Sequence, residues 1–397
     1  MTISYATRMS GVRPSAIREL LRHGADPEVI SFGGGYPDPS LFPATELGEI
    51  FQKLLPGAAA DTLQYTESRG LPALRAHIAR RLTRDGLTCD ADDVLVIQGA
   101  QQGLDLVAKL VLNAGDTVVT ENPTFLGALI AFAPFEPRYA PVRIDDDGMD
   151  TDHLEETLTL NPEAKLLYTV PDFQNPTGAT LSLERRRRLL DLADRHDLLV
   201  IEDSPYRELR YKGTSLPTLR SLDTRGRVVH LGSFSKILAP GLRLGWAVAD
   251  SEVLEKLSLL KLAADTQCST LNMAAATAYL DNFDIEAHIT RSCAAYKHKR
   301  DLALHTLGEV LPPAIRFTRA QGGLFTWLSF PTGFDTAAFM RDTLLPQAKV
   351  AYVPGATFFP NAQEPNHARL SFSGVADGTL VHGLTRLGEL TRQELGD

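Results

Sequence analysis

Short apolar runs alternate with longer amphipathic stretches between residues 90 and 250 of this 397-residue chain. The runs lie at 94–97, 117–119, 165–170, 198–201, 228–231 and 244–249, and amphipathic stretches lie at 102–112 and 183–196. Runs of this length that are wholly apolar or that alternate with a two-residue period are typical of strands, and a 3.6-residue period is typical of helices. The pattern predicts an α/β fold with a mostly parallel central sheet.

The remainder of the chain predicts a second, smaller unit. A helical stretch at 285–311 ends at Pro312 and Pro313, which stop a helix. Beyond it, short strands at 325–330, 350–353 and 369–372 surround helical pieces at 336–345 and near the C-terminus, as in a small α+β domain. We expect an N-terminal arm over 1–45, a large domain over 46–290 and a small domain over 291–397.

Composition excludes several classes of protein. With 40 basic and 49 acidic residues the net charge is −9, which disfavours a nucleic-acid partner. No window approaches 18 unbroken apolar residues, and the first residues lack the apolar core of a signal peptide, so we expect no membrane association. Cys89, Cys268 and Cys293 are odd in number and widely spaced, which indicates reduced structural thiols and a cytoplasmic protein. The basic run 185–188 predicts an exposed helix face.

Two hydroxyls and two cations follow the predicted strand at 228–231. Ser233, Ser235 and Lys236 come directly after it, and Arg243 follows seven residues after the lysine. Such a group suits a phosphate next to a nucleophilic amine. Taken alone, the motif is more typical of an ordinary turn.

Polar side chains also follow two other predicted strands. Asp203 and Tyr206 come after the run 198–201, and Asn175 comes after the run 165–170. In isolation the Asp203 motif is equally typical of a solvated turn, and the Asn175 motif is more typical of a plain Asn-Pro turn. Because the carboxyl ends of parallel strands meet at one edge of a sheet, the three motifs together predict a ligand site there.

At these positions the chain resembles the fold-type I pyridoxal-phosphate aminotransferases. The resemblance extends from residue 15 to residue 373 and is strongest with the 2-aminoadipate and kynurenine aminotransferase subgroup. The segments that carry it are SAIRE at 15–19, FGGGYP at 32–37, LQY at 63–65, QQG at 101–103 and GGLFTW at 322–327. It implies that the large domain binds pyridoxal 5'-phosphate and that the N-terminal arm supplies a substrate loop.

The resemblance implies roles around the cofactor ring. Lys236 would form the covalent link to the cofactor and shuttle the substrate proton. Asp203 would keep the ring nitrogen protonated, so that the ring can accept electrons. Asn175 and Tyr206 would hydrogen-bond the phenolate oxygen. Phe125 would stack on the ring, where relatives commonly carry Tyr, so a hydroxyl contact is absent.

The resemblance also implies how the phosphate is held. Backbone N–H groups around Ala100 and Gln101 would point at it from the start of a helix. Ser233, Ser235 and Arg243 would complete the site. Relatives often carry a hydroxyl residue where this chain has Ala100, so one phosphate hydrogen bond is expected to be missing.

Substrate and subunit contacts are implied in the same way. Arg369 would bind the substrate α-carboxylate through two parallel hydrogen bonds, together with Asn175. Gly35 would let the N-terminal loop approach that carboxylate. Arg18 matches a position that can meet a distal carboxylate. Tyr65 would reach the phosphate of the neighbouring subunit, which implies a homodimer with shared sites.

Three functions follow as hypotheses. The first is an aminotransferase acting by a ping-pong mechanism between a 2-aminoadipate-, aromatic- or branched-chain-like amino acid and a 2-oxo acid, with 2-oxoglutarate as the expected acceptor. The second is a same-fold enzyme that catalyses decarboxylation, elimination or oxidation, because the same lysine and aspartate serve these reactions. The third is a non-enzymatic regulator, which needs a basic DNA-binding domain ahead of residue 15, where only 14 residues precede. No metal site is expected.

Overall fold

The computed structural model describes residues 3–12, 26–57, 59–361 and 364–396. Its largest sheet has eight strands in the order β2-β9-β8-β7-β6-β3-β4-β5 among these residues. Neighbours from β8 through β7, β6 and β3 to β4 are parallel, whereas β9 and β5 run antiparallel to their neighbours. The strands are β2 (Val94–Ile97), β3 (Thr117–Asn122), β4 (Arg138–Asp145), β5 (Gly148–Met149), β6 (Leu166–Thr169), β7 (Leu199–Asp203), β8 (Val228–Ser233) and β9 (Gly245–Val248). The predicted mostly parallel sheet is confirmed.

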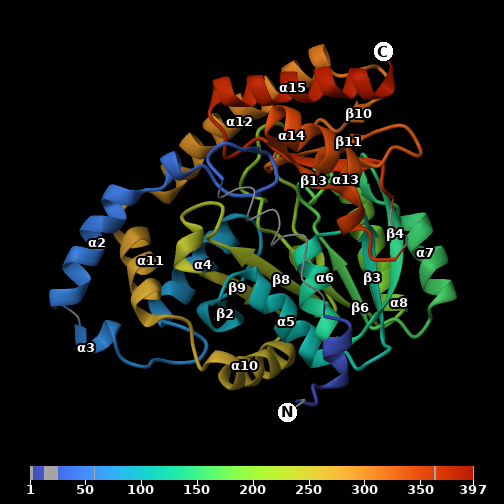
Figure 1. The fold of residues 1–397 in the computed structure, drawn as a ribbon. Coiled ribbons are helices and arrows are strands. Elements are labelled where there is room, and N and C mark those ends of the chain that lie inside the picture. Colours follow the sequence, from blue (N-terminus) through green and yellow to red (C-terminus); the bar gives the residue numbers. More distant parts are fainter. Residues whose placement is uncertain (1–2, 13–25, 58, 362–363, 397) are drawn as a thin grey trace.

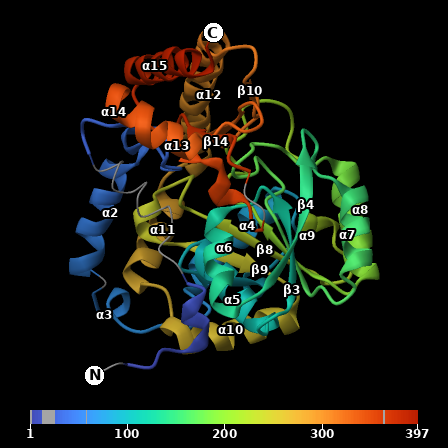
Figure 2. The same ribbon diagram turned by 45° about the vertical axis from the view of Figure 1, so that its right-hand side comes forward.

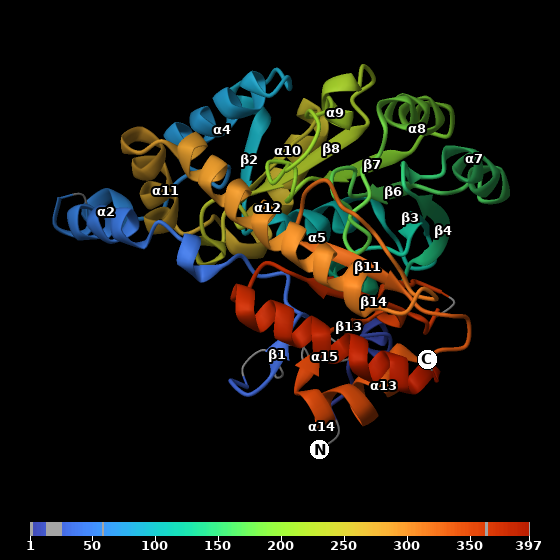
Figure 3. The same ribbon diagram turned by 90° about the horizontal axis from the view of Figure 1, so that it is seen from above.

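Both faces of this sheet are buried against helices. Val118 and Leu166 belong to one apolar cluster, while their successors Val119 and Leu167 belong to another, as the two-residue period of a strand requires. One face is covered by α5 (Ala100–Val111), α6 (Leu126–Phe132) and α10 (Ser251–Asp265), and the other by α7 (Thr151–Leu160), α8 (Leu183–Arg195) and α9 (Leu219–Leu222). Figure 3 shows the second set along one side of the sheet, and Figure 2 shows α5 and α6 on the other. Burial on both faces explains the continuous apolar runs.

A second layer of helices packs at the β2 end of the sheet (Figure 1). There α11 (Thr270–Asn282) contacts α2 (Ala44–Gly57), α3 (Ala59–Thr62) and α4 (Pro72–Arg84). The loop that carries Tyr65 runs between α3 and α4.

The C-terminal part has its own sheet and core. Strands β10 (Arg316–Phe317), β11 (Phe325–Ser329), β14 (His367–Ser371) and β13 (Val353–Pro354) form an antiparallel sheet in that order. Helices α12 (Ile285–Val310) and α15 (Asp377–Leu395) lie side by side over it (Figure 3). Helix α12 joins two cores, because Ile289 packs in the core of the large sheet and Leu307 in that of the small one. The domain boundary at residue 290 therefore stays a prediction.

The segment expected as one strand at 350–353 is divided. Its first part, β12 (Val350–Ala351), pairs in parallel with β1 (Ile30–Ser31), whereas β13 pairs with β14. Between them the buried Tyr352 donates a hydrogen bond from Oη to the Thr336 carbonyl at 2.6 Å. The helical stretch that follows residue 335 comprises α13 (Thr336–Phe339), a π-helical turn (Met340–Leu344) and α14 (Leu345–Ala348).

The basic run 185–188 is not a uniformly exposed face, so that prediction is wrong for one residue. Arg186 is fully buried, and its guanidinium donates to Asp172 Oδ1 at 2.9 Å. It lies on the same stripe of α8 as Leu189 and Ala193, which the helical period turns towards the sheet. Arg185 and Arg188 instead form ion pairs with acids near the surface. The three cysteines are free, as predicted. Within the described ranges, no helix is long and apolar enough to cross a membrane.

Candidate active site

The three predicted strand-end motifs meet at the carboxyl edge of β6, β7 and β8. Asp203 is the last residue of β7, Ser233 is the last residue of β8, and Asn175 lies in the loop after β6. The side chains of Asn175 and Tyr206 touch, with Nδ2 donating to Oη at 3.3 Å. The three motifs lie close together because β6, β7 and β8 are adjacent and parallel, so that their carboxyl ends meet at one edge.

Asp203 presents one free carboxylate oxygen. Tyr168 Oη donates to its Oδ2 at 2.9 Å, while no group among the described residues donates to Oδ1, although that atom is buried. Burial raises the pKa of the Asp203 carboxyl to about 6, and the hydrogen bond from Tyr168 opposes this shift. A buried acceptor without a donor fits a ligand that brings an N–H group.

Arg369 is a buried cation next to Asn175. Its Nη1 donates to Asn175 Oδ1 at 2.8 Å and its Nη2 to the Gly33 carbonyl at 2.7 Å, while the buried Nε has no acceptor among the described residues. The guanidinium lies 4.2 Å from the ring centroid of Phe325 and 5.1 Å from that of Phe358. Burial lowers the pKa of Arg369 to about 10. No carboxylate in the described part of the chain pairs with it, so the residue can accept an anionic ligand.

Lys236 lies over the ring of Tyr206, with its Nζ 5.9 Å from the ring centroid. Its Nζ donates to the Gly35 carbonyl at 2.8 Å. Burial lowers the pKa of Lys236 to about 8, and the positive charges of Arg369 and Arg243 contribute to this shift. A lysine that loses its proton this readily is a better nucleophile and base. A Cβ at Gly35 would stand 2.7 Å from the Phe325 ring, so this ring already requires glycine there, and the predicted approach of Gly35 to substrate stays a prediction.

An anion cradle lies at the start of α5. Gly99 precedes the helix with a φ of 72°, and no side chain caps the helix N-terminus. A Cβ on Gly99 would stand 2.9 Å from Arg243 Nη2, so the guanidinium lies directly over the backbone leading to Ala100. Arg243 forms no ion pair within the described ranges and bonds only backbone carbonyls. The Ser235 amide donates to Ser233 Oγ at 3.0 Å, which brings both hydroxyl residues to the same loop. These groups fit a phosphate.

Gln101 and Phe125 pack together beside this cradle. Gln101 Nε2 donates to the Gly127 carbonyl at 2.7 Å, and Phe125 stands at the N-terminal cap of α6. A Cβ on Gly127 would meet both side chains, at 2.4 Å from Phe125 Cζ and 2.9 Å from Gln101 Oε1. The predicted stacking of Phe125 on the cofactor ring stays a prediction.

One predicted site residue, Tyr65, is not brought to this cluster within the described chain. Tyr65 is 81% exposed, and Leu63 beside it is 64% exposed. Arg18 lies outside the described residues. The proposed contacts of Tyr65 and Arg18 remain predictions.

Other residues of the cluster were not identified from the sequence. Tyr168 lies in the middle of a predicted strand, where an aromatic residue carries no functional signal. Phe325 and Phe358 flank Arg369 from distant positions in the sequence, and only the tertiary structure brings them together.

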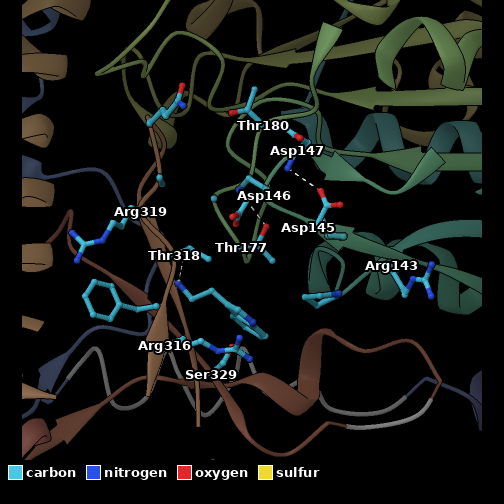
Figure 4. A pocket seen from close by; sticks show the side chains of 18 of the residues that line it. Arg143, Asp145, Asp146, Asp147, Thr177, Thr180, Arg316, Thr318, Arg319 and Ser329 are labelled. Carbon is cyan, nitrogen blue, oxygen red and sulfur yellow. Dashed lines mark hydrogen bonds between the residues drawn. The ribbon is translucent and has the colours of Figure 1, made fainter. Parts of the chain in front are cut away.

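The structure also has a large cleft, which is shown in Figure 4. It has a volume of about 1030 Å³ and contains neither Lys236, Asp203 nor Arg243. Asp145, Asp146 and Asp147 line one wall, and Arg316, Arg319 and other residues of the C-terminal part line the opposite wall. The Trp327 indole lines the cleft, stacks on His367 and packs edge-on against Phe358, which in turn flanks Arg369. We assign the reaction to the cluster, because it holds the buried carboxylate oxygen without a donor, Asp203 Oδ1, and the amine of Lys236, and neither residue lines the cleft.

Comparison with known proteins identifies the family. Residues 33–387 match the family model described as aminotransferase class I and II. The chain belongs to this family. Aromatic-amino-acid aminotransferase 1 of Thermococcus litoralis is 38% identical over 397 residues, covering 98% of this chain and 94% of that protein.

Two solved structures are similar over almost the whole aminotransferase. One is the kynurenine aminotransferase of Pyrococcus horikoshii in complex with PMP, with a TM-score of 0.92, 37% identity, and coverage of 98% and 97% of the two chains. The other is the α-aminoadipate aminotransferase of Thermus thermophilus, complexed with N-(5'-phosphopyridoxyl)-L-leucine, with a TM-score of 0.92, 35% identity, and coverage of 99% and 98%. The predicted family, fold and aminotransferase function are confirmed.

Pyridoxal phosphate is the cofactor of this aminotransferase. When bound, it takes up the amino group and absorbs the electrons left at the substrate Cα. The residues present fit it: Asp203 Oδ1 lacks a donor, Lys236 is a low-pKa amine, and the start of α5 with Arg243 forms an anion cradle.

Borohydride should fix the cofactor to Lys236. The purified enzyme should be yellow, and hydride reduction should remove the visible absorption band because the covalent link to Nζ becomes irreversible. Peptide mass mapping of the reduced protein checks this, with Lys236→Ala as the control that retains no cofactor after denaturation. Cofactor mass on a different lysine would overturn the assignment.

Proposed function

We propose that this aminotransferase moves the amino group of 2-aminoadipate-, aromatic- or branched-chain-like amino acids to 2-oxoglutarate. One observation carries the proposal: Arg369 is only 7% exposed, with no carboxylate partner in the described chain and with an unpartnered Nε. A buried cation of this kind is stabilised by a ligand carboxylate. An α-carboxylate is the group that every amino donor and every 2-oxo acceptor has in common.

Each residue of the cluster has a distinct task in this reaction. Arg369 and Asn175 hold the α-carboxylate and orient the substrate. Lys236 Nζ, with its lowered pKa, takes the proton from Cα and returns it at the end of the transfer. Asp203 Oδ1 accepts the ring N–H, and Tyr206 Oη, held by Asn175, donates to the phenolate oxygen.

The breadth of donors follows from the surroundings of Arg369. The rings of Phe325 and Phe358 flank the guanidinium and offer apolar surface to aromatic or aliphatic side chains. An acidic donor needs a second cation for its distal carboxylate, and we assign that task to Arg18. The relatives support this breadth, because their names include aromatic, kynurenine and α-aminoadipate aminotransferases.

We also propose a cytoplasmic homodimer with a large cofactor domain and a small C-terminal domain. Leu63 and Tyr65 form an exposed apolar pair, and Leu55 of α2 is 45% exposed nearby in sequence. Apolar surface of this kind is typical of a protein interface. The neighbouring subunit would place Tyr65 at the phosphate.

A panel of amino donors tests the proposed function. Leucine, phenylalanine, kynurenine, 2-aminoadipate and alanine are each supplied with 2-oxoglutarate, and glutamate formation and the cofactor spectrum are followed. We expect glutamate with acidic and with apolar donors, and a spectral change when each donor is added without acceptor. Carbon dioxide or ammonia released without glutamate would instead indicate decarboxylation or elimination and would overturn the proposal.

A further inference from the structure

We propose that Glu121 is a positioning residue for the transfer reaction: from beneath the loop 171–179 it holds the amide of Gln174 and thereby fixes the place of Asn175. This inference rests on the proposed function, because it assumes that Asn175 serves the substrate and cofactor. Glu121 lies near the end of β3, on the opposite face of the sheet from Asp203.

Glu121 is a buried carboxylate surrounded only by donors. It is 2% exposed. Its Oε1 accepts from Thr169 Oγ1 at 2.6 Å and from the Val170 amide at 3.1 Å, and its Oε2 accepts from Gln174 Nε2 at 2.9 Å. Burial raises the pKa of Glu121 to about 7, and no cation among the described residues forms an ion pair with it. The three donors therefore supply its stabilisation.

Gln174 uses every polar atom to close the loop. Its Oε1 accepts from the Thr177 amide at 2.9 Å and from Thr177 Oγ1 at 2.8 Å, and its Nε2 also donates to the Pro123 carbonyl at 2.9 Å. Its own amide donates to the Ala179 carbonyl at 2.8 Å. Thr177 offers donors to the oxygen of the Gln174 side-chain amide, whereas Glu121 and Pro123 offer acceptors to its nitrogen. Only one orientation of this amide therefore satisfies all partners.

Asn175, the residue after Gln174, contacts the groups that we assign to the substrate and the cofactor. Asn175 bonds Arg369 through Oδ1 and Tyr206 through Nδ2. Hydrogen bonds thus link the Glu121 carboxyl group under the loop, through Gln174 and its neighbour Asn175, to the two groups that we assign to the α-carboxylate and the phenolate oxygen. A shift of the Gln174 amide moves Asn175, and small misplacements of this kind cost about a hundredfold in rate.

The Glu121→Gln variant isolates this contact. Its Oε1 can keep both donors, but its new NH₂ group faces Gln174 Nε2, so two donors oppose each other. We expect kcat/KM to fall by about tenfold to a hundredfold, by the same factor for an acidic and an apolar donor. Hydrogen exchange of the amides in 173–179 should accelerate in the cofactor-free protein, which is a readout independent of activity.

Thr169→Val is the matched control, because it removes a donor from the other oxygen of Glu121 without touching Gln174. It should lower Tm, yet leave loop exchange unchanged and kcat/KM within about threefold. The double exchange Glu121→Gln with Gln174→Glu re-forms the pair with donor and acceptor reversed. The kcat/KM of the double variant should be about tenfold higher than that of either single variant. It should stay below the wild-type value, because the hydrogen bond to the Pro123 carbonyl is lost.

Two outcomes would overturn the inference. One is a Glu121→Gln enzyme with a lower Tm but with normal hydrogen exchange in residues 173–179 and a normal kcat/KM. The other is a double variant no better than the product of the single losses. If Glu121→Gln does not fold, Gln174→Met removes the same contact from the loop side and is read in the same way. A wild-type enzyme inactive with every donor would refute the proposed function, while the exchange measurement would still decide the role of Glu121.

Discussion

Replacing Asp203 by alanine should lower the rate of amino-group transfer by about a thousandfold or more, with cofactor still bound. We assign this carboxylate to the ring nitrogen, because its buried Oδ1 has no donor among the described residues, while Oδ2 is bonded by Tyr168. Without it the nitrogen loses its proton, and the ring accepts electrons poorly. Such a buried charge pair supplies about 4 kcal/mol of transition-state stabilisation, which corresponds to about a thousandfold in rate.

The loss should appear in a single-turnover half-reaction monitored by the cofactor spectrum. Tyr168→Phe is the control, because it keeps the carboxylate and removes only the hydrogen bond to Oδ2, so the loss should be far smaller. Cofactor content and Tm are measured for both variants to separate chemistry from folding. A near-normal half-reaction in Asp203→Ala would refute the electron-acceptor role.

Replacing Arg369 by alanine should impair every donor and acceptor together. Its guanidinium is the buried cation that we assign to the common α-carboxylate, and the aromatic rings beside it exclude water. A desolvated carboxylate left without its partner costs about 2 to 5 kcal/mol, or roughly 30-fold to several thousandfold in kcat/KM. Arg369→Lys should recover only part of this loss, because a lysine cannot make two parallel hydrogen bonds.

Arg18→Ala should separate the two classes of donor. Glutamate, 2-aminoadipate and 2-oxoglutarate should lose rate, whereas leucine-like and aromatic donors should remain nearly unchanged in their own half-reaction. Single-turnover rates for one acidic and one apolar donor with each arginine variant decide the question. An equal loss for both donors in Arg18→Ala would remove Arg18 from the specificity pocket.

Much of the large sheet was predictable because its strands are buried on both faces. The run 94–97 coincides with β2, and 228–231, apolar except for His230, lies within β8, because most residues of a strand buried on both faces are apolar. The helix expected at 183–196 corresponds to α8 for a similar reason, since one stripe faces the sheet. The strand β4 (Arg138–Asp145) lacks this signal, because exposed and buried residues mix along it, and it was not predicted.

The sequence by itself determined the alternation of elements and the chemistry at three strand ends, because hydrophobic period and residue type are local properties. Only the tertiary structure decided which partner each buried polar group meets. Arg186 is buried because Asp172 lies opposite it, and Glu121 meets Gln174 across 53 residues of chain. Burying a charge is costly without a partner, and the partner is chosen by strand register and loop closure, which no local pattern encodes.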